Sequence, residues 1–291
     1  MVRGPSPARG APPHDAPERP LDEDAPEWPV DERERARRVA GRLRDAEVPD
    51  PDTDARLLVR HASPEGLAEL VARREAREPL QLILGAVGFR YSDLEVRPGV
   101  FIPRPETEVL AGEAIERVGE GAVVVEPCTG SGAVAIAVAT ESPAGAVHAT
   151  DSSPHAVDLA RRNAAAVGAE ISVREGDLLS PLPSALLGRV DVLVANPPYV
   201  ATAEVAGLEP EVADWDPRDA LVSGPTGHGT TDRLIAQGRR WLAPEGWLLL
   251  EVAAPRAEAT ARRAEAAGYE AVGVIEDLTG RERIVRARLR R

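Results

Sequence analysis

The feature that most constrains this fold is the regular alternation, from residue 122 onward, of short apolar segments with helical segments. The short segments are rich in valine, leucine and alanine and are bounded by turn-forming residues, which is typical of buried strands. Strands linked by helices form a mostly parallel sheet with helices on both faces. We predict strands at 122–126, 146–150, 171–174, 190–195 and 246–252, helices at 132–140, 154–167, 231–242 and 255–267, and a final antiparallel hairpin at 269–275 and 283–287.

The whole chain divides into four parts with different patterns. Residues 1–29 are rich in proline and charged residues and hold almost no large apolar side chains, so we expect a disordered tail. Apolar residues recur at helical spacing over 30–78, which predicts a small helical domain suited to substrate recognition. Residues 79–108 predict a β-hairpin linker, and residues 109–291 form the α/β domain.

Two local patterns define elements that precede the sheet. A Pro-Asp-Pro sequence interrupts the helical region at 49–51, so Asp52 or Thr53 is expected to cap the next helix. In the linker, Leu80, Leu82 and Leu84 alternate with other residues before two nearby glycines. This alternation favours the first strand of the hairpin.

Net charge and residue usage argue against several classes of protein. The formal net charge is −13 and lysine is absent, which disfavours nucleic-acid binding through clustered basic residues. A single cysteine, Cys128, excludes an intramolecular disulfide, and the five histidines show no ligand spacing, so we expect no metal site. No apolar run reaches ~18 residues and no signal segment begins the chain, so we expect a cytoplasmic protein without a membrane contact.

The predicted strand at 190–195 ends in the tetrapeptide Asn196-Pro197-Pro198-Tyr199. Two prolines cannot continue a strand ladder, so the chain must leave the sheet here. An amide, two rigid residues and an aromatic ring therefore lie at the carboxyl edge of the sheet, where open α/β proteins bind their ligands. The alternative interpretation is a proline-rich turn without chemistry.

A glycine-rich turn after the first predicted strand supplies a cofactor pocket beside this tetrapeptide. Gly130 and Gly132 permit a tight turn and a close approach of backbone to a ligand, as in dinucleotide and S-adenosylmethionine sites. The strict G-x-G-x-x-G pattern fails because Ala135 stands at the third glycine. Asp151 ends the second strand, where a carboxylate can accept both ribose hydroxyls of either ligand. Asp177 is placed to accept from an adenine amino group or to cap a turn.

Together these residues resemble the class I S-adenosylmethionine-dependent methyltransferases, and more narrowly the HemK/PrmC family of protein N5-glutamine methyltransferases. The segment Ile102-Pro103-Arg104-Pro105-Glu106-Thr107-Glu108 makes the match specific, because the N-P-P-Y sequence is shared with other amino methyltransferases. The resemblance spans about residues 30 to 291, and it includes 77–81, 129–133, 209–212 and 216–221. It implies a Rossmann-like class I sheet with an antiparallel C-terminal strand and a small N-terminal helical domain.

The resemblance also implies a set of site residues and a cofactor. The methyl donor would be S-adenosyl-L-methionine, which leaves as S-adenosyl-L-homocysteine. The implied catalytic residues are Asn196, Pro197, Pro198 and Tyr199. The implied cofactor-binding residues are Glu126, Cys128, Thr129, Gly130, Ser131, Gly132, Asp151, Ser152, Asp177, Leu178 and Asn196. The implied linker and substrate-side residues are Phe101, Pro103, Arg104, Pro105, Glu106 and Thr107.

The acceptor that the resemblance implies is a glutamine side-chain amide in a protein, in the Gly-Gly-Gln loop of peptide chain release factors. Asn196 Oδ1 and the Pro197 carbonyl can each accept a hydrogen bond from that amide and aim its nitrogen at the methyl group. Tyr199 can pack on the planar amide. We expect a protein substrate, no direct contact with nucleic acid, and a monomer or weak dimer.

Three other functions fit part of the pattern. A small-molecule N- or O-methyltransferase with the same scaffold would explain departures from the family, such as Glu126-Pro127-Cys128 in place of Asp-Leu-Gly. A nucleic-acid amino methyltransferase would share the N-P-P-Y sequence but predicts a basic groove. A binding module without enzymatic activity would leave the loop at Asn196 without a role.

Overall fold

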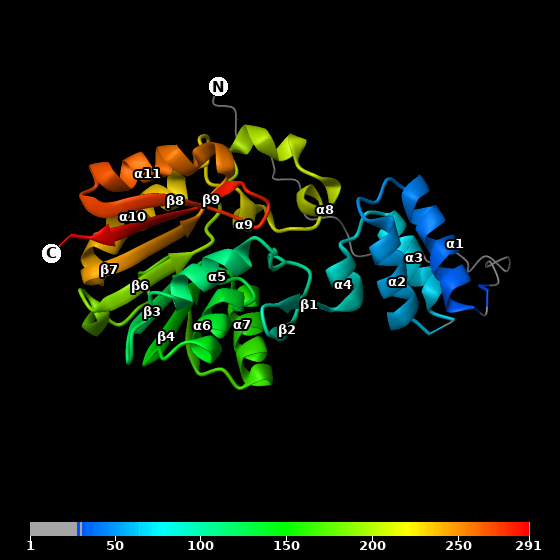
Figure 1. The fold of residues 1–291 in the computed structure, drawn as a ribbon, viewed down its shortest axis with the longest axis horizontal. Coiled ribbons are helices and arrows are strands. Elements are labelled where there is room, and N and C mark those ends of the chain that lie inside the picture. The colour runs from blue at the N-terminus through cyan, green and yellow to red at the C-terminus, as the bar shows by residue number, and fades with distance from the viewer. Residues whose placement is uncertain (1–27, 30, 64, 291) are drawn as a thin grey trace, which may run out of the picture.

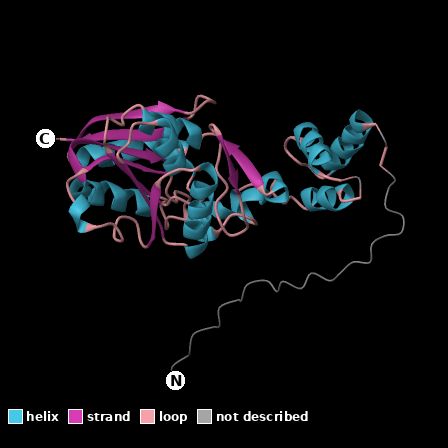
Figure 2. Cartoon of the chain, turned by 90° about the horizontal axis from the view of Figure 1, so that it is seen from below, coloured by secondary structure: helices cyan, strands magenta, loops and turns pink. Residues whose placement is uncertain are grey.

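The computed structural model describes residues 28–29, 31–63 and 65–290 of the chain. A helical N-terminal part and a larger α/β part lie side by side, with a short helix and a β-hairpin between them (Figures 1 and 2). The predicted tail at 1–29 falls outside the described residues except for Trp28 and Pro29. The Trp28 ring centre lies 5.8 Å from the guanidinium carbons of Arg38 and Arg42, and the ring packs against the helical core. Trp28 therefore belongs to the helical part and not to a tail.

The N-terminal part is built from the helices α1 (Glu32–Asp45), α2 (Pro51–His61) and α3 (Leu67–Glu75). Their apolar faces pack together, with Leu43 and Leu58 fully buried at the centre. The predicted cap of α2 is wrong, because Asp50 takes this role and accepts a hydrogen bond from the Thr53 amide at 3.3 Å. Proline has no N–H to satisfy and suits the first helical position, so the cap falls on the residue before Pro51.

The strand predicted at Leu80, Leu82 and Leu84 is also wrong, because Leu80–Leu84 forms the short helix α4. A run of apolar residues this short does not distinguish a strand from a buried helix by its period. Leu80 and Ile83 lie three residues apart and are buried against the bundle, and Gly85 ends the helix with a φ of 75°. The hairpin follows as β1 (Ala86–Phe89) and β2 (Ser92–Glu95).

The α/β part contains a seven-stranded sheet with the order β5-β4-β3-β6-β7-β9-β8. The five strands from β5 to β7 pair in parallel, and β9 is antiparallel to both β7 and β8. This arrangement confirms the predicted sheet and its C-terminal hairpin. The strands are β3 (Val123–Pro127), β4 (Ala146–Asp151), β5 (Ile171–Glu175), β6 (Val190–Ala195), β7 (Leu242–Glu251), β8 (Tyr269–Glu276) and β9 (Glu282–Leu289).

Helices cover both faces of this sheet (Figure 1). On β6, Val192 and Val194 pack into the core with α5, α6 and α7, whereas Leu193 and Ala195 pack into the core with α10 and α11. Successive side chains of a strand point to opposite faces, so a strand buried on both sides reads as an unbroken apolar run. The helices are α5 (Thr107–Ile115), α6 (Ala133–Glu141), α7 (Pro154–Val167), α10 (Gly229–Trp241) and α11 (Ala257–Ala266).

The segment between β6 and α10 contains η2 (Thr202–Gly207), α8 (Pro210–Ala213) and α9 (Arg218–Leu221). The remaining short 3-10 helices are η1 (Ser184–Leu186) and η3 (Ala254–Arg256). Glu211 of α8 forms ion pairs with Arg74 at 3.0 Å and Arg77 at 2.7 Å in the helical part. All three side chains are largely buried, so these ion pairs tie the helical part to the segment that follows the N-P-P-Y sequence.

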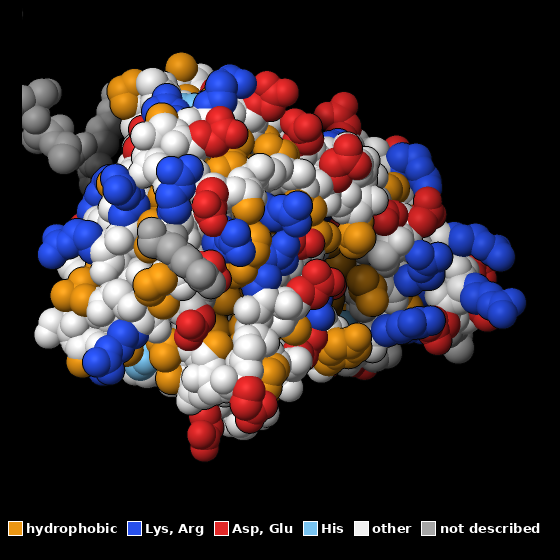
Figure 3. All heavy atoms as spheres, turned by 60° about the vertical axis from the view of Figure 1, so that its left-hand side comes forward, with side chains coloured by type: hydrophobic (Ala, Val, Ile, Leu, Met, Phe, Trp, Pro, Cys, Tyr) orange, Lys and Arg blue, Asp and Glu red, His pale blue; other side chains and the backbone are white. Residues whose placement is uncertain are grey.

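Two expectations from composition concern the helices and the surface of the protein. In the described part of the chain, no helix is both long and apolar enough to cross a membrane. On the face shown in Figure 3, arginine side chains lie among aspartates and glutamates and do not form a continuous basic surface.

Candidate functional site

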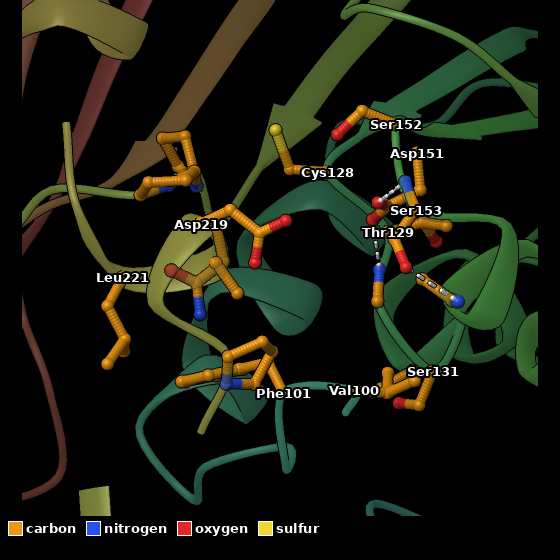
Figure 4. Close-up of a pocket in the computed structure, with 18 of the residues that line it drawn as sticks. Val100, Phe101, Cys128, Thr129, Ser131, Asp151, Ser152, Ser153, Asp219 and Leu221 are labelled. Atoms are coloured by element: carbon orange, nitrogen blue, oxygen red, sulfur yellow. Dashed lines mark hydrogen bonds between the residues drawn. The ribbon is translucent and has the colours of Figure 1, made fainter. Parts of the chain in front are cut away.

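A pocket of about 290 Å³ lies at the carboxyl edge of the sheet, where β3, β4 and β6 end. Segments that are far apart in the sequence line it together (Figure 4). The lining residues come from within the segments 99–107, 126–134, 151–156, 177–178, 196–200 and 217–221. The cofactor loop and the N-P-P-Y sequence therefore share one cavity, as the ends of neighbouring parallel strands predict.

Most of the predicted site residues line this pocket. They are Phe101, Pro103, Thr107, Glu126, Cys128, Thr129, Gly130, Ser131, Asp151, Ser152, Asp177, Leu178, Asn196, Pro197, Pro198 and Tyr199. The predicted residues Arg104, Pro105, Glu106 and Gly132 are not part of the lining. The pocket also includes His155, Asp219 and Leu221, which were not predicted as site residues, although Asp219 and Leu221 lie in the segment 216–221 that contributes to the resemblance.

Glu126 holds the glycine-rich loop in shape. Its Oε2 accepts hydrogen bonds from Thr129 Oγ1 at 2.5 Å and from the Ala135 amide at 2.9 Å. Burial raises the pKa of Glu126 to about 8, so the carboxyl group is mostly protonated at neutral pH. This side chain joins the end of β3 to the first turn of α6 and adds little negative charge to the pocket.

Gly132 has a packing role. Its φ is 86°, and a Cβ added here would lie 3.1 Å from Ala160 Cβ on α7. Any side chain would therefore push α6 away from α7, and a left-handed φ strains residues other than glycine. The need for glycine at this position comes from helix packing, because Gly132 itself does not line the pocket.

Asp151 closes the loop from the neighbouring strand. Its Oδ2 accepts from the Gly130 amide and its Oδ1 from the Ser153 amide, each at 2.9 Å. Each carboxylate oxygen can accept more than one hydrogen bond, so both retain capacity for ribose hydroxyls. Burial raises the pKa of Asp151, and the two backbone hydrogen bonds oppose that rise.

Asp177 and Leu178 form the rim of the pocket beyond β5. The Asp177 carboxylate is exposed and forms an ion pair with Arg233 of α10. Leu178 is buried, and its carbonyl accepts a hydrogen bond from Thr150 Oγ1 at 2.6 Å. The hydrogen bond from Thr150 at the end of β4 fixes Leu178 in place. A flat apolar group can pack against the rim beside this leucine.

The Asn196 side chain is oriented by Thr107 at the start of α5. Asn196 Nδ2 donates to Thr107 Oγ1 at 3.2 Å. Burial raises the pKa of Glu251 and hydrogen bonding to Thr107 opposes that rise, so the Thr107 hydroxyl lies close to both Glu251 and Asn196. Because Nδ2 is used in this way, Asn196 Oδ1 is left as an acceptor for a ligand in the pocket.

Glu251 ends β7 directly beside the tetrapeptide. The parallel register pairs Ala195 with Leu250, so Glu251 and Asn196 are the next residues on adjacent strands. Glu251 is buried, its Oε2 has no hydrogen-bond partner among the described residues, and desolvation raises its pKa to about 7. This carboxylate therefore lies behind the pocket wall and contacts Thr107.

Tyr199 is held from the far side of the loop by Arg283 of β9. Arg283 Nη1 donates to the Tyr199 hydroxyl at 3.3 Å, and Arg283 Nη2 lies 3.6 Å from Glu106 Oε1. Burial raises the pKa of Tyr199 to about 12, so the phenol remains neutral. Glu106 thus acts through Arg283 on the tyrosine, and does not reach the pocket itself.

The I-P-R-P-E-T-E segment and the segment at 216–221 are tied together at the pocket mouth. Asp216 is buried, forms an ion pair with Arg104 and accepts from the Ile102 amide at 3.5 Å. The Arg104 guanidinium also lies over the Phe101 ring, 5.0 Å from its centre. Arg104 is therefore a support for Phe101 and for the wall that carries Asp219.

The charges around the pocket fit a cationic cofactor. Three carboxylates line it, those of Asp151, Asp177 and Asp219, beside the mostly protonated Glu126, and among the described residues no arginine does. A dinucleotide would bring two phosphates into this acidic surrounding, which costs free energy unless cations or amides balance them. The sulfonium of S-adenosylmethionine carries the opposite charge and would be stabilised here. Asp151 would hold its ribose, and the loop at 129–131 would lie against the rest of the cofactor.

The comparisons with known proteins agree with this geometry. The chain is 41% identical over 230 residues to a release factor glutamine methyltransferase of Streptomyces coelicolor, an alignment that covers 72% of this chain and 80% of the relative. It is 41% identical over 269 residues to the Mycolicibacterium smegmatis protein of that name, covering 84% and 93%. The chain belongs to the release factor glutamine methyltransferase family. Its methyl donor is accordingly S-adenosylmethionine.

Two further comparisons concern the catalytic domain of this family member. Residues 106–209 match the family described as methyltransferase small domain. The fold resembles a solved methyltransferase from Pyrococcus furiosus, with a TM-score of 0.52, 19% identity and coverage of 68% of this chain and 89% of that one. This likeness supports the class I methyltransferase fold.

Cys128 lies in the glycine-rich loop, but it does not have the properties of a nucleophile. Its φ is 59°, and burial together with the Asp151 charge raises the pKa of the thiol far above its usual range. A neutral thiol is neither a strong nucleophile nor a metal ligand. In the described ranges, no group of three His, Cys, Asp or Glu residues is placed to hold a metal ion.

Proposed function

We propose that this methyltransferase transfers the methyl group of S-adenosylmethionine to the side-chain amide nitrogen of a glutamine in a protein, the Gly-Gly-Gln loop of a peptide chain release factor. The orientation of Asn196 is the observation that carries the proposal. With Nδ2 bound to Thr107, Oδ1 has no hydrogen-bond partner among the described residues and is left as an acceptor beside the glycine-rich loop. An amide NH2 group has two protons to donate, and Asn196 Oδ1 and the Pro197 carbonyl supply two acceptors.

The bound cofactor supplies an electrophilic methyl group on a positively charged sulfur. The residues of this chain would then have one main task, which is to hold the glutamine nitrogen in line with that methyl group. Asn196 and Pro197 stand at the end of a strand buried on both faces, and two consecutive prolines limit the backbone motion of the loop. The acceptors are thus preorganised before the substrate binds.

Electron flow in this proposal is a simple displacement. The amide nitrogen forms a bond to the methyl carbon while the carbon–sulfur bond breaks, and its electron pair stays on sulfur. The nitrogen then loses one proton to water. Hydrogen bonds from the NH2 group to Asn196 Oδ1 and to the Pro197 carbonyl would draw its protons out of the amide plane. The nitrogen then becomes more pyramidal, its lone pair is less conjugated with the amide carbonyl, and it is more nucleophilic. Tyr199, held neutral by burial and contacted by Arg283, provides a flat surface for the amide.

The test is methylation of a purified release factor by the purified full chain with isotopically labelled S-adenosylmethionine. Mass spectrometry should locate one added methyl group on the glutamine of the Gly-Gly-Gln loop. Replacement of that glutamine by alanine in the release factor is the matched control and should remove the label. Label confined to small molecules of a cell lysate would overturn the proposal in favour of a small-molecule methyltransferase.

The proposed function also implies a cellular location and an assembly state for the protein. A protein that acts on release factors is expected in the cytoplasm, as a monomer or weak dimer and without direct binding to nucleic acid. The relatives named above support the release factor as partner. Light scattering of the purified chain measures the assembly state.

A further inference from the structure

Three of the four carboxyl groups that line the pocket already have a partner or a proton. Glu126 accepts two hydrogen bonds from the loop and is mostly protonated at neutral pH. Asp151 accepts backbone hydrogen bonds at both oxygens, and Asp177 is paired with Arg233. Each of these groups therefore supports the walls of the site as well as facing it.

Asp219 is the exception. It lies in α9, the wall opposite the glycine-rich loop, and its carboxylate points into the pocket toward the side of Cys128 and Thr129 (Figure 4). The residue is exposed, and no hydrogen bond or ion pair joins its side chain to any part of the described chain. Its charge is nonetheless close enough to Asp151 to raise the pKa of that carboxyl group. Two like charges thus face each other across the space that the cofactor fills.

We propose that Asp219 is a specificity-determining residue that makes this pocket prefer the charged methyl donor to its neutral product. S-Adenosylmethionine and S-adenosylhomocysteine share the adenine, the ribose and the amino acid group, and they differ by one methyl group and the positive charge on sulfur. A carboxylate without a protein counter-ion attracts the sulfonium and relieves its own repulsion from Asp151 when the cation enters. After methyl transfer that attraction is lost, and the product is released more readily.

The segment that carries Asp219 is fixed well enough to hold this charge in place. Asp216 ties it to the I-P-R-P-E-T-E segment through Arg104 and the Ile102 amide. Val200 after the N-P-P-Y sequence forms a backbone bridge with Val222, just beyond α9. Asp219 therefore stays on the pocket wall, where its distance from the sulfonium is set by the fold.

The experiment is calorimetric binding of S-adenosylmethionine and S-adenosylhomocysteine to the full-length wild type and to Asp219→Asn. The variant should bind the methyl donor about three- to fivefold more weakly, in line with a partly solvated charge pair, and bind the product within about twofold of wild type. Asp214→Asn is the matched control, because Asp214 is exposed on the same segment and does not line the pocket. It should change neither affinity.

A second readout is the dependence on salt. The wild type should lose affinity for the methyl donor as ionic strength rises, and the Asp219→Asn variant should lose less, because screening acts on the charge pair that it lacks. Equal weakening for both ligands, or no change for either, would overturn the proposal. An effect of Asp219→Asn only on the KM for the protein substrate would also overturn the proposal, because Asp219 would then contact the protein substrate and not the methyl donor. The inference rests on the methyl donor alone, so failure of the release-factor assay leaves it standing.

Discussion

Replacement of Thr107 by valine tests the hydrogen bonding that orients Asn196, the asparagine proposed to hold the acceptor amide. Valine has nearly the same shape as threonine and removes only the hydroxyl group that joins Asn196 to Glu251. Thr107 is 4% exposed, so little water is available to replace the lost group. Without the hydroxyl group, the Asn196 side chain loses the hydrogen bond that favours one of the two orientations related by a flip of its amide.

The expected effect on catalysis follows from the one hydrogen bond at 3.2 Å. A neutral hydrogen bond of this kind contributes about 0.5–1.5 kcal/mol, so the kcat of Thr107→Val should fall by about three- to tenfold. Stability should fall by about 2 kcal/mol, because the buried Glu251 carboxyl group also loses a donor and its Oε2 already lacks a hydrogen-bond partner within the described ranges. Affinity for S-adenosylmethionine should stay within about twofold.

Steady-state methylation of the release factor gives kcat, calorimetry gives the affinity, and thermal unfolding gives the stability. Thr107→Ser is the matched control, since it keeps the hydroxyl group and should keep kcat within about twofold of wild type. The reasoning is refuted if the valine and serine variants have the same kcat. A loss of S-adenosylmethionine affinity as large as the loss of kcat would also refute it, because Thr107 would then serve the cofactor.

Three other predictions concern the acceptor, the cofactor and a buried acid. Asn196→Ala should abolish methyl transfer but change S-adenosylmethionine affinity, measured by calorimetry, by no more than about tenfold, or roughly 1.4 kcal/mol. Asp151→Ala should weaken calorimetric binding of the methyl donor by about 10- to 100-fold, and unchanged affinity would reject its contact with the ribose. Burial raises the pKa of Glu126 from 4.5 to about 8, so its contribution to stability is complete below 4.5 and is lost as pH rises through about 8. In chemical unfolding the wild type should therefore lose stability relative to Glu126→Gln over that range, by at most about 1.4 kcal/mol per pH unit, and parallel curves would contradict the raised pKa.

The sheet and the position of the site could be predicted because both depend on local patterns. Unbroken apolar runs identify strands buried on both faces, and the residues that end those runs must meet at one edge. Asn196, Asp151 and the loop at 129–131 line one pocket at this edge, as these local patterns predict. Each ends a strand or opens a helix, so its position needed no knowledge of long-range packing.

Other features could not be predicted because tertiary contacts decide them. Leu80–Leu84 became a helix since Leu80 and Ile83 bury one face against the bundle, which no five-residue pattern reveals. Asp219 lies 68 residues beyond Asp151 in the chain, and only the return of the segment after the tetrapeptide brings the two carboxylates together. The Pro-Asp-Pro sequence at 49–51 predicts the start of a helix, but the cap is Asp50, before Pro51, and not the predicted Asp52 or Thr53.

Residues of the linker hold the N-P-P-Y sequence in place, so substrate specificity depends on the linker as well as on the tetrapeptide. Asn196 is oriented by Thr107, and Tyr199 by an arginine that also contacts Glu106, so two successive residues of the linker act on the two ends of the N-P-P-Y sequence. A linker with other residues at these positions would leave the asparagine free to flip and the tyrosine without its support. The tetrapeptide alone can hold many planar amino groups. The linker determines which atoms of the tetrapeptide accept hydrogen bonds from the substrate. A substrate must therefore match hydrogen-bond acceptors whose orientation is set by residues outside the tetrapeptide. For this reason the N-P-P-Y sequence by itself does not identify the group that receives the methyl.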